Sequence, residues 1–442
     1  MSYVHCVART SLCSAAVLIL LHGCVGVARA AEEASNADAI ELGARLFRER
    51  NFTNPAADYG SSCGECHADG SDVQGRPARV FADYTPQSLT ATKEMTLRNT
   101  PTLLGVADHE RLGWDGAHAS LEELVFDKLL GPTMGWRPTD QERALAAIHF
   151  TLAHEGDGGA SDTASYAEAI QGAYAVDVET MTIEEGVRIG SRAIADYVRS
   201  LRSTRTSPWD AFVSMNRLHP GPIDGETVEN FAAGVWSRLG NQEGRQLVKR
   251  PKGFTQEAYR GFKTFFRTAP EGEAAVGNCV TCHVPPDFTD GQFHNAGVSE
   301  AAYDAVHGSG SAAAYGQPAA PSEATRSRPA ADDRSRIDLG RFNVAPEEPG
   351  AVGAFKTPTL RSLAGTDPYM HDGAYSTLED AVRAKMRAAE QARAGRLPWA
   401  DPEIADIRIG EDDVAPLVAF LRQLHDVGRA GFRELLVNLE AD

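Results

Sequence analysis

Two copies of the pattern C-x-x-C-H constrain this chain more than any other feature of its sequence. They occupy residues 63–67 and 279–283. Two thiols three positions apart can add to the two vinyl groups of one porphyrin, and the adjoining imidazole then lies over the iron. The spacing therefore predicts two covalently attached c-type haems. The expected attachment points are Cys63, Cys66, Cys279 and Cys282, and the expected iron ligands are His67 and His283.

Two other uses of a C-x-x-C pair compete with this interpretation. A four-thiolate zinc site would leave both trailing histidines unexplained. A thioredoxin-like redox pair would normally lie on a turn from a strand to a helix, which neither motif resembles. The cysteine count favours haem attachment, because Cys6, Cys13 and Cys24 precede residue 30 and the other four of the seven cysteines are the two pairs.

The first 30 residues have the pattern of a secretory signal peptide. They carry Arg9, no acidic residue, an apolar run over residues 15–21, and the triplet Ala-Arg-Ala at 28–30. We predict cleavage after Ala30; a lipoprotein cut before Cys24 is the competing interpretation. Either cut exports the chain, as attachment of c-type haem requires, and we expect a periplasmic location. Nothing after the leader is apolar enough to cross a bilayer.

The charge of the chain bears on its partners. Its formal net charge is −18 at pH 7, which argues against nucleic acid as a partner. An acidic surface suits a basic electron donor such as a small cytochrome, although such a surface also serves solubility alone.

An internal repeat predicts the domain organisation. The sequence TPTL at 100–103 recurs at 357–360, DGA at 115–117 recurs at 372–374, and the same offset of 257 residues aligns Leu121 with Leu378. A gapless repeat of this kind indicates duplication.

Helical patterns dominate both repeats. An amphipathic segment precedes each haem motif, over 41–47 and 259–266, and another closes each unit, over 194–201 and 414–421. Strand signals are few. We therefore predict an all-α fold of two cytochrome c-like haem domains related by internal duplication. The expected parts are a signal peptide (1–30), an N-terminal haem domain (38–205), a connector (206–256) and a C-terminal haem domain (257–430).

These motifs together resemble the bacterial di-haem cytochrome c peroxidase and MauG family. The most specific stretches are FKTPTLR at 355–361, TDPYMHDG at 366–373, RNTPT at 98–102 and WDG at 114–116. The resemblance covers essentially the whole chain after the leader. It implies a peroxide-reactive haem in the N-terminal domain, an electron-relay haem in the C-terminal domain, two haem c groups and an interdomain Ca²⁺.

The resemblance also assigns roles to single residues. Trp114 matches the tryptophan between the two haems, where an aromatic ring can couple the irons, and His371 matches a histidine near the domain interface. Both are therefore candidate catalytic residues. Asn99 matches the side-chain ligand of the calcium ion, with Thr366 and Pro368 supplying backbone carbonyls, and hard oxygen donors are what Ca²⁺ requires.

Three departures from the family pattern concern the iron sites. No histidine occurs between His67 and His109 to serve as a distal ligand of the first haem, so we expect that iron to be open, with Met95 or Tyr84 as competing ligands. The turn Gly131-Pro132 is present, but no carboxylate follows in the expected place. In strict register the sixth ligand of the second haem is Lys385; we favour the adjacent Met386, because a thioether raises the haem potential as a relay needs.

Three functions fit this sequence. The first is a di-haem oxidoreductase that reduces hydrogen peroxide with electrons from a small donor protein, either a cytochrome c or a cupredoxin. The second is a MauG-like enzyme that oxidises Trp or Tyr residues of a partner protein. The third is a di-haem electron carrier without enzymatic activity, which would require both irons to be six-coordinate. Family members are often dimers, and a homodimer is possible here.

Overall fold

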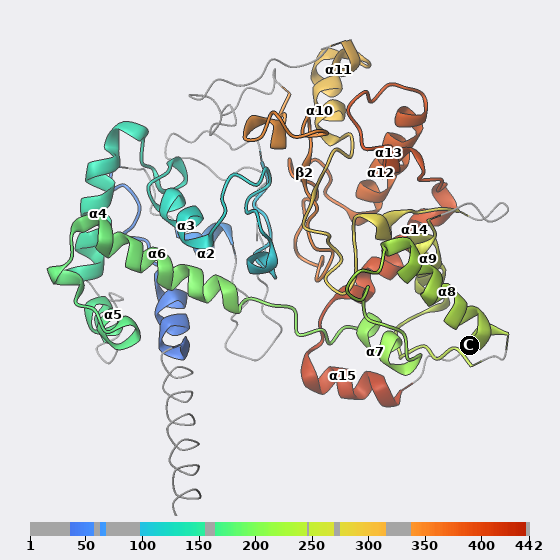
Figure 1. The fold of residues 1–442 in the computed structure, drawn as a ribbon, viewed down its shortest axis with the longest axis horizontal. Coiled ribbons are helices and arrows are strands. Elements are labelled where there is room, and N and C mark those ends of the chain that lie inside the picture. Colours follow the sequence, from blue (N-terminus) through green and yellow to red (C-terminus); the bar gives the residue numbers. More distant parts are fainter. Residues whose placement is uncertain are drawn as a thin grey trace, which may run out of the picture.

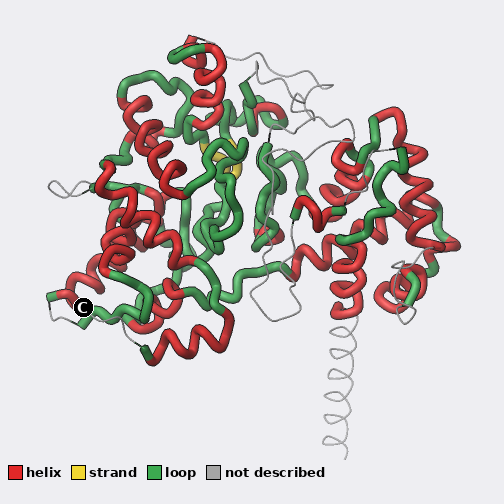
Figure 2. Tube along the Cα trace, turned by 180° about the vertical axis from the view of Figure 1, so that it is seen from behind, coloured by secondary structure: helices red, strands yellow, loops and turns green. Residues whose placement is uncertain are grey.

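The computed structural model describes residues 36–56, 62–67, 98–154, 164–244, 247–268, 275–314 and 337–438. The proposed signal peptide and the candidate ligands Tyr84 and Met95 lie outside these ranges. Two groups of helices lie side by side, and extended loops run between them (Figures 1 and 2). The predicted helical class is confirmed, since the strands of the described residues are one two-residue pair.

The first group of helices surrounds the first haem motif. It begins with a helix over residues 36–46. The remaining elements are α2 (Cys63–Cys66), η1 (Val106–Asp108), α3 (Leu121–Leu129), η2 (Pro132–Met134), η3 (Pro138–Asp140), α4 (Gln141–His154), α5 (Tyr166–Tyr174), η4 (Val178–Thr180) and α6 (Ile183–Ser200).

The second group contains the second haem motif. Its elements up to the strand pair are α7 (Pro208–Met215), α8 (Val228–Glu243), α9 (Gln256–Phe266), η5 (Cys279–Thr281), β1 (Phe293–His294), α10 (Val298–His307), α11 (Ser311–Ala314), η6 (Arg341–Asn343) and β2 (Phe355–Lys356). The chain ends with α12 (Leu378–Arg393), α13 (Pro402–Ala405), α14 (Glu411–Leu421), η7 (Arg422–Leu424) and α15 (Gly428–Val437).

The stretch predicted as a connector, 206–256, forms part of the second group. It contains α7 and α8, and Trp209 and Phe212 of α7 are buried in the same core as Phe262 of α9. The Trp209 ring lies 5.3 Å from that of Phe262 and 5.6 Å from that of Phe420, centroid to centroid. Burial of these large rings ties this stretch to the C-terminal haem domain.

A close helix contact occurs once in each group. A Cβ atom added to Gly43 would lie 1.9 Å from the carbonyl oxygen of Ala193 in α6, and one added to Gly261 of α9 would lie 1.8 Å from that of Pro416 in α14. Only a glycine permits backbones to approach this closely. These crossings bring the helix before each haem motif onto the helix that closes the unit. Duplication itself stays a prediction.

The helices that follow each Asp-Gly turn also begin alike. Ser120 caps α3 by accepting a hydrogen bond from the amide of Glu123, and Thr377 caps α12 by accepting one from Asp380. Such caps satisfy amides left unpaired at a helix start. Both helices therefore start at the positions that the repeat aligns, Leu121 and Leu378. No described helix combines the length and the apolar character needed to span a bilayer.

Candidate haem sites and the residues between them

The hydrogen bonding of the His283 imidazole leaves one of its two nitrogens available to a metal. Its Nδ1 lies 3.0 Å from the carbonyl oxygen of Phe288. A carbonyl can only accept, so Nδ1 carries the proton and Nε2 keeps its lone pair. Burial lowers the pKa of His283 to about 4, with the Phe288 hydrogen bond acting in the opposite direction. The ring is therefore neutral at pH 7, as an iron ligand must be.

His67 has a similar environment in the first group. Its amide donates to the carbonyl of Cys63 at 2.7 Å, which closes the turn of α2. Burial lowers the pKa of His67 to about 4, and the backbone of Pro101 opposes this effect. Its Nδ1 atom is buried without a hydrogen-bond partner among the described residues. A neutral, buried imidazole suits iron ligation.

The four motif cysteines are free thiols, and each is half-buried. Burial raises the pKa of Cys63 and of Cys279 to about 12, so neither is a thiolate nucleophile at pH 7. Apolar side chains surround the second pair: Leu360, Leu363 and Val382 pack with Cys279 against the core. Half-buried thiols next to a neutral histidine and apolar walls fit a covalent haem at each motif.

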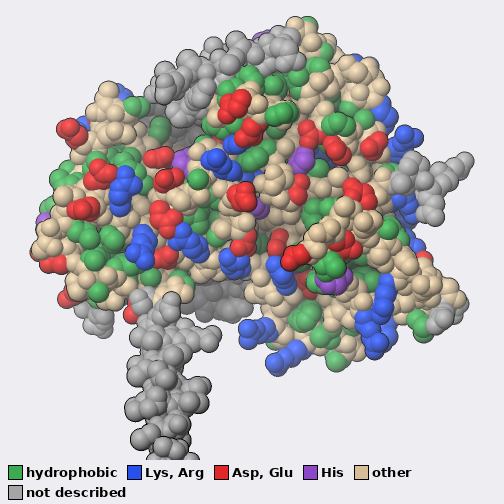
Figure 3. All heavy atoms as spheres, in the orientation of Figure 1, with side chains coloured by type: hydrophobic (Ala, Val, Ile, Leu, Met, Phe, Trp, Pro, Cys, Tyr) green, Lys and Arg blue, Asp and Glu red, His purple; other side chains and the backbone are tan. Residues whose placement is uncertain are grey.

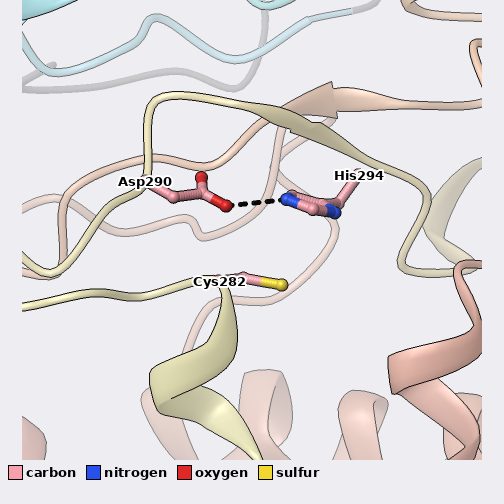
Figure 4. Close-up of side chains that lie close together, drawn as sticks. All are labelled: Cys282, Asp290 and His294. Atoms are coloured by element: carbon pink, nitrogen blue, oxygen red, sulfur yellow. Dashed lines mark hydrogen bonds and ion pairs between the residues drawn. The ribbon is translucent and has the colours of Figure 1, made fainter. Parts of the chain in front are cut away.

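His294 pairs with two carboxylates. Figure 4 shows it with one of them, Asp290, beside Cys282. His294 Nε2 lies 2.8 Å from Asp290 Oδ2, and its Nδ1 pairs with Asp401. Burial opposes protonation, but these hydrogen bonds raise the pKa of His294 well above its ordinary value. One ligand atom each from Cys282, Asp290 and His294 lie within 4.8 Å of one another. A thioether bond to haem would use the sulfur of Cys282. We therefore interpret Asp290 and His294 as residues that support the chain beside the haem attachment site, and not as a separate metal site.

The predicted catalytic pair lies together between the two groups. Trp114 Nε1 donates to the carbonyl of Asn99 at 2.7 Å, and the amide of Asn99 donates to the carbonyl of His371 at 2.6 Å. The rings of Trp114 and His371 are 6.3 Å apart, edge to face, and His371 stacks on Phe355 at 3.5 Å. Burial lowers the pKa of His371 to about 3, so its ring is neutral.

The predicted calcium ligands are brought together only in part. The amide nitrogen of Asn99 donates to the carbonyl of Pro368 at 2.6 Å. The hydroxyl of Thr366 donates to the carbonyl of Leu363 at 2.9 Å, which leaves the Thr366 carbonyl, the predicted ligand atom, untested. Calcium binds oxygen atoms, so a cation at this place requires the Asn99 amide to turn its oxygen toward Pro368. Calcium stays a prediction.

No carboxylate approaches the Gly131-Pro132 turn in the described residues. The turn continues into η2, where Met134 is buried, and Trp136 is buried with its Nε1 donating to Phe52 at 2.9 Å. The acids on either side have other partners: Asp127 pairs with His118 and Asp140 with Arg143. The lack of a carboxylate in this register stays a prediction.

Two lysines lie near the predicted haem-ligating histidines. Lys385 of α12 is half-buried and close enough to both thiols of the second motif, and to His283, to influence their pKa values. Lys128 of α3 acts on His67 in the same way. Burial lowers the pKa of Lys385 to about 8 and also lowers that of Lys128. Met386, the predicted sixth ligand, is half-buried on the next position of α12.

Known proteins are similar to this chain in sequence. A model of the di-haem cytochrome c peroxidase family matches residues 37–217. A cytochrome-c peroxidase, IdrP2, of Denitromonas iodatirespirans is 27% identical over 395 residues, which cover 89% of this chain and 83% of the relative. The methylamine utilization protein MauG of Methylophilus methylotrophus is 24% identical over 386 residues, which cover 87% of this chain and 81% of that protein.

Solved structures share the fold. The di-haem peroxidase BthA of Burkholderia thailandensis superposes with a TM-score of 0.54 at 21% identity, over 91% of this chain and 88% of that one. A MauG-like protein associated with microbial copper homeostasis gives 0.52 at 20%, over 88% and 89%. The resemblance to the di-haem cytochrome c peroxidase and MauG family that the motifs indicated is thereby confirmed.

Proposed function

We propose that this protein is a periplasmic di-haem oxidoreductase that reduces hydrogen peroxide with electrons from a small donor protein. His283 and His67 would each hold a haem, the two haems would supply the redox chemistry, and the Trp114 region would couple the two sites. The observation that carries this proposal is the aromatic contact between the two groups, in which Trp114, His371 and Phe355 follow one another at 6.3 Å and 3.5 Å.

The residues of the chain have distinct roles in this scheme. The bound haems supply the redox chemistry with peroxide and donor. The four cysteines fix the porphyrins, and His67 and His283 hold the irons with neutral imidazoles. Trp114 is held rigidly, because its indole donates to Asn99 and its carbonyl accepts from the amide of Lys356 at 2.9 Å. A fixed ring keeps the distance between the sites constant.

The donor is a small electron-transfer protein, a cytochrome c or a cupredoxin. The net charge of −18 favours a basic partner. Acidic and basic side chains are interspersed on the face shown in Figure 3, without a large patch of one sign. Charge steering at this face is therefore weak.

A second candidate is a MauG-like oxidation of Trp or Tyr residues in a partner protein. The turn after Gly131 favours it, because Met134 and Trp136 are buried there and the neighbouring carboxylates of Asp127 and Asp140 are paired elsewhere. An enzyme without an acid–base carboxylate beside the iron lacks one usual aid to O–O cleavage.

An optical and EPR study of the oxidised protein tests the proposal. We expect a high-spin ferric signal that disappears with one equivalent of hydrogen peroxide and returns when reduced cytochrome c is added. Discharge by a partner protein but not by cytochrome c would favour the MauG-like reaction. If both haems are low-spin and peroxide changes nothing even after half-reduction, the protein is an electron carrier.

A tryptophan variant tests the route between the sites. Trp114→Phe keeps an aromatic ring but removes the indole that bonds Asn99, and we expect it to slow turnover with donor and peroxide at least tenfold. Trp236→Phe, on α8, is the matched control with a half-buried indole. Equal turnover in the two variants would refute a role for Trp114.

A further inference from the structure

We propose that Lys356 binds a propionate carboxylate of the haem attached at the first motif. The lysine belongs to the second group of helices, so the second group would complete the site of the first haem. This inference rests on the haem sites of the proposed function and not on the reaction with peroxide. The ammonium group would hold the carboxylate by charge and by hydrogen bonds, which are strong between ionised partners.

The side-chain amine of Lys356 is buried without a hydrogen-bond partner. The residue is 8% exposed, and its Nζ atom makes no hydrogen bond among the described residues. The centroid of the Phe293 ring lies 5.7 Å from Nζ, which offers only a weak cation–π contact. Burial lowers the pKa of Lys356 to about 8, so the amine keeps its proton at pH 7. A buried ammonium group without an anion is costly, so a partner is expected.

The acidic side chains in this neighbourhood are bound by other groups. Asp115, whose charge acts on Lys356, accepts from Arg98 at 2.6 Å with one oxygen and from a backbone amide at 3.2 Å with the other. Arg341, which also acts on Lys356, is bound by both carboxylate oxygens of Glu348. Neither acid bonds the lysine, so its anion has to come from another source.

The pairing of β1 with β2 shows which way the lysine points. Phe293 lies opposite Lys356, and His294 lies opposite Phe355. Residues opposite each other share one face of a strand pair, and successive residues alternate between the faces. The ligand atoms of His294 and Cys282 lie within 4.8 Å of each other, so the face of His294 turns to the second haem motif. Lys356 lies on the opposite face.

That opposite face meets the first group of helices. A Cβ atom added to Gly116 would lie 2.4 Å from the ring of Phe293. Arg341 lies over the same ring at 4.8 Å and donates to the carbonyls of Asp115 and Gly116, both at 3.1 Å. This Asp-Gly turn leads into α3, which packs in the same core as the first haem motif. The lysine therefore points toward the site of the first haem.

A haem c brings the anion that this place lacks. Its vinyl groups are used by the two cysteines and its iron by the histidine, so both propionate carboxylates remain available. The strand that carries Lys356 is held in place, because its amide donates to the carbonyl of Trp114 at 2.9 Å. A fixed cation beside a haem favours ferrous iron, which carries one positive charge less than ferric iron. Lys356 would therefore raise the potential of the first haem.

Redox potentiometry of the holoprotein without peroxide tests this assignment. Lys356→Met should shift the equilibrium of the first haem about tenfold toward ferric iron, equal to about 59 mV for a one-electron couple. Lys356→Arg should retain most of the wild-type potential. Lys252→Met removes the same charge from an exposed position and should leave both potentials unchanged. His67→Met, which alters only the first iron, identifies the signals of that haem.

Resonance Raman spectra give a second measurement that does not depend on the potential. The propionate bending mode of the first haem should move in Lys356→Met and stay in place in Lys252→Met, because only the first variant removes a partner of the carboxylate. Lys356→Gln keeps a hydrogen-bond donor without the charge and should also lower the potential. It serves as the test if haem content and circular dichroism show that Lys356→Met does not fold.

Three outcomes would overturn the proposal. The first is an equal potential of the first haem in Lys356→Met and Lys252→Met, and the second is a shift confined to the second haem. The third is a wild-type potential that changes with chloride or acetate at constant ionic strength, which would show that the lysine binds a dissolved anion. Failure of peroxide turnover in wild type would refute the proposed function but not this assignment, because neither measurement uses peroxide.

Discussion

Arg98 joins the two groups of helices through buried ion pairs, and its removal should weaken the whole protein. Its guanidinium binds Asp338 at 2.7 and 2.9 Å and Asp115 at 2.6 Å. The three side chains are at most 13% exposed. Arg98→Met keeps the length of the side chain but leaves two buried carboxylates without their cation. Loss of one partner of such a pair costs about 3–5 kcal/mol.

The pKa of Asp338 gives an independent magnitude. Burial alone would raise it, but Arg98 lowers it from 3.8 to about 2. That shift corresponds to about 2.4 kcal/mol at about 1.4 kcal/mol per pKa unit. Because the folded pKa is depressed, this stabilisation is complete above pH 4 and is lost as the pH falls toward 2. We therefore expect Arg98→Met to lose about 3 kcal/mol at pH 7 and less at pH 3.

Urea unfolding of the holoprotein at both pH values measures this effect, followed by the Soret band and by far-ultraviolet circular dichroism. Arg202→Met is the matched control, since Arg202 pairs with Asp108 and both side chains are at least 50% exposed. Exposed pairs contribute about 0–1 kcal/mol. The reasoning fails if the two variants lose equal stability at pH 7, or if the cost of Arg98→Met does not change with pH.

Two further variants test the core and the first haem site. Gly261→Ala should lower the melting temperature, because the new Cβ would lie 1.8 Å from the carbonyl oxygen of Pro416. Gly234→Ala in α8 is the control and should raise the melting temperature, because its Cβ would meet no atom within 4 Å and alanine favours a helix. A higher melting temperature of Gly261→Ala would contradict the close contact. If the first haem is open as we propose, Lys128→Met should weaken cyanide binding to it about tenfold, equal to about 1.4 kcal/mol, because the charge of Lys128 acts at His67. Soret titration measures the affinity; Lys128→Arg should retain it, and equal affinity in both variants would exclude a role for a cation at that site.

The parts of the fold that could be predicted from the sequence depend on short-range patterns. Helical periodicity marks the segments before and after each haem motif, and the repeat aligns the starts of α3 and α12 at Leu121 and Leu378. The family resemblance also brought Trp114, Asn99 and His371 into one neighbourhood, and hydrogen bonds link them in the fold. These features are local or carried by motifs, so a single sequence contains them.

The parts that could not be predicted depend on partners far apart in the chain. His294 is clamped by Asp401, 107 residues away, and Arg98 by Asp338, 240 residues away. Nothing in the local sequence links such pairs. The stretch 206–256 looked like a connector because its prolines interrupt the helical pattern, yet Trp209 packs among rings of α9 and α14. Pro208 does not interrupt a helix but begins α7, where a proline is favoured.

Lys128 and Lys385 lie at the same place in both repeats, but their surroundings differ. The helix after each Asp-Gly turn places a lysine at its eighth residue, and each lysine acts on the histidine of its own motif. What differs is the surroundings. Lys385 is half-buried near two thiols, where a neutral amine avoids the desolvation cost of a charge. Burial also lowers the pKa of Lys128, and the charges of Asp115 and Asp127 oppose that effect. The repeat thus fixes where each lysine lies, and side chains from elsewhere in the chain set how readily it keeps its proton.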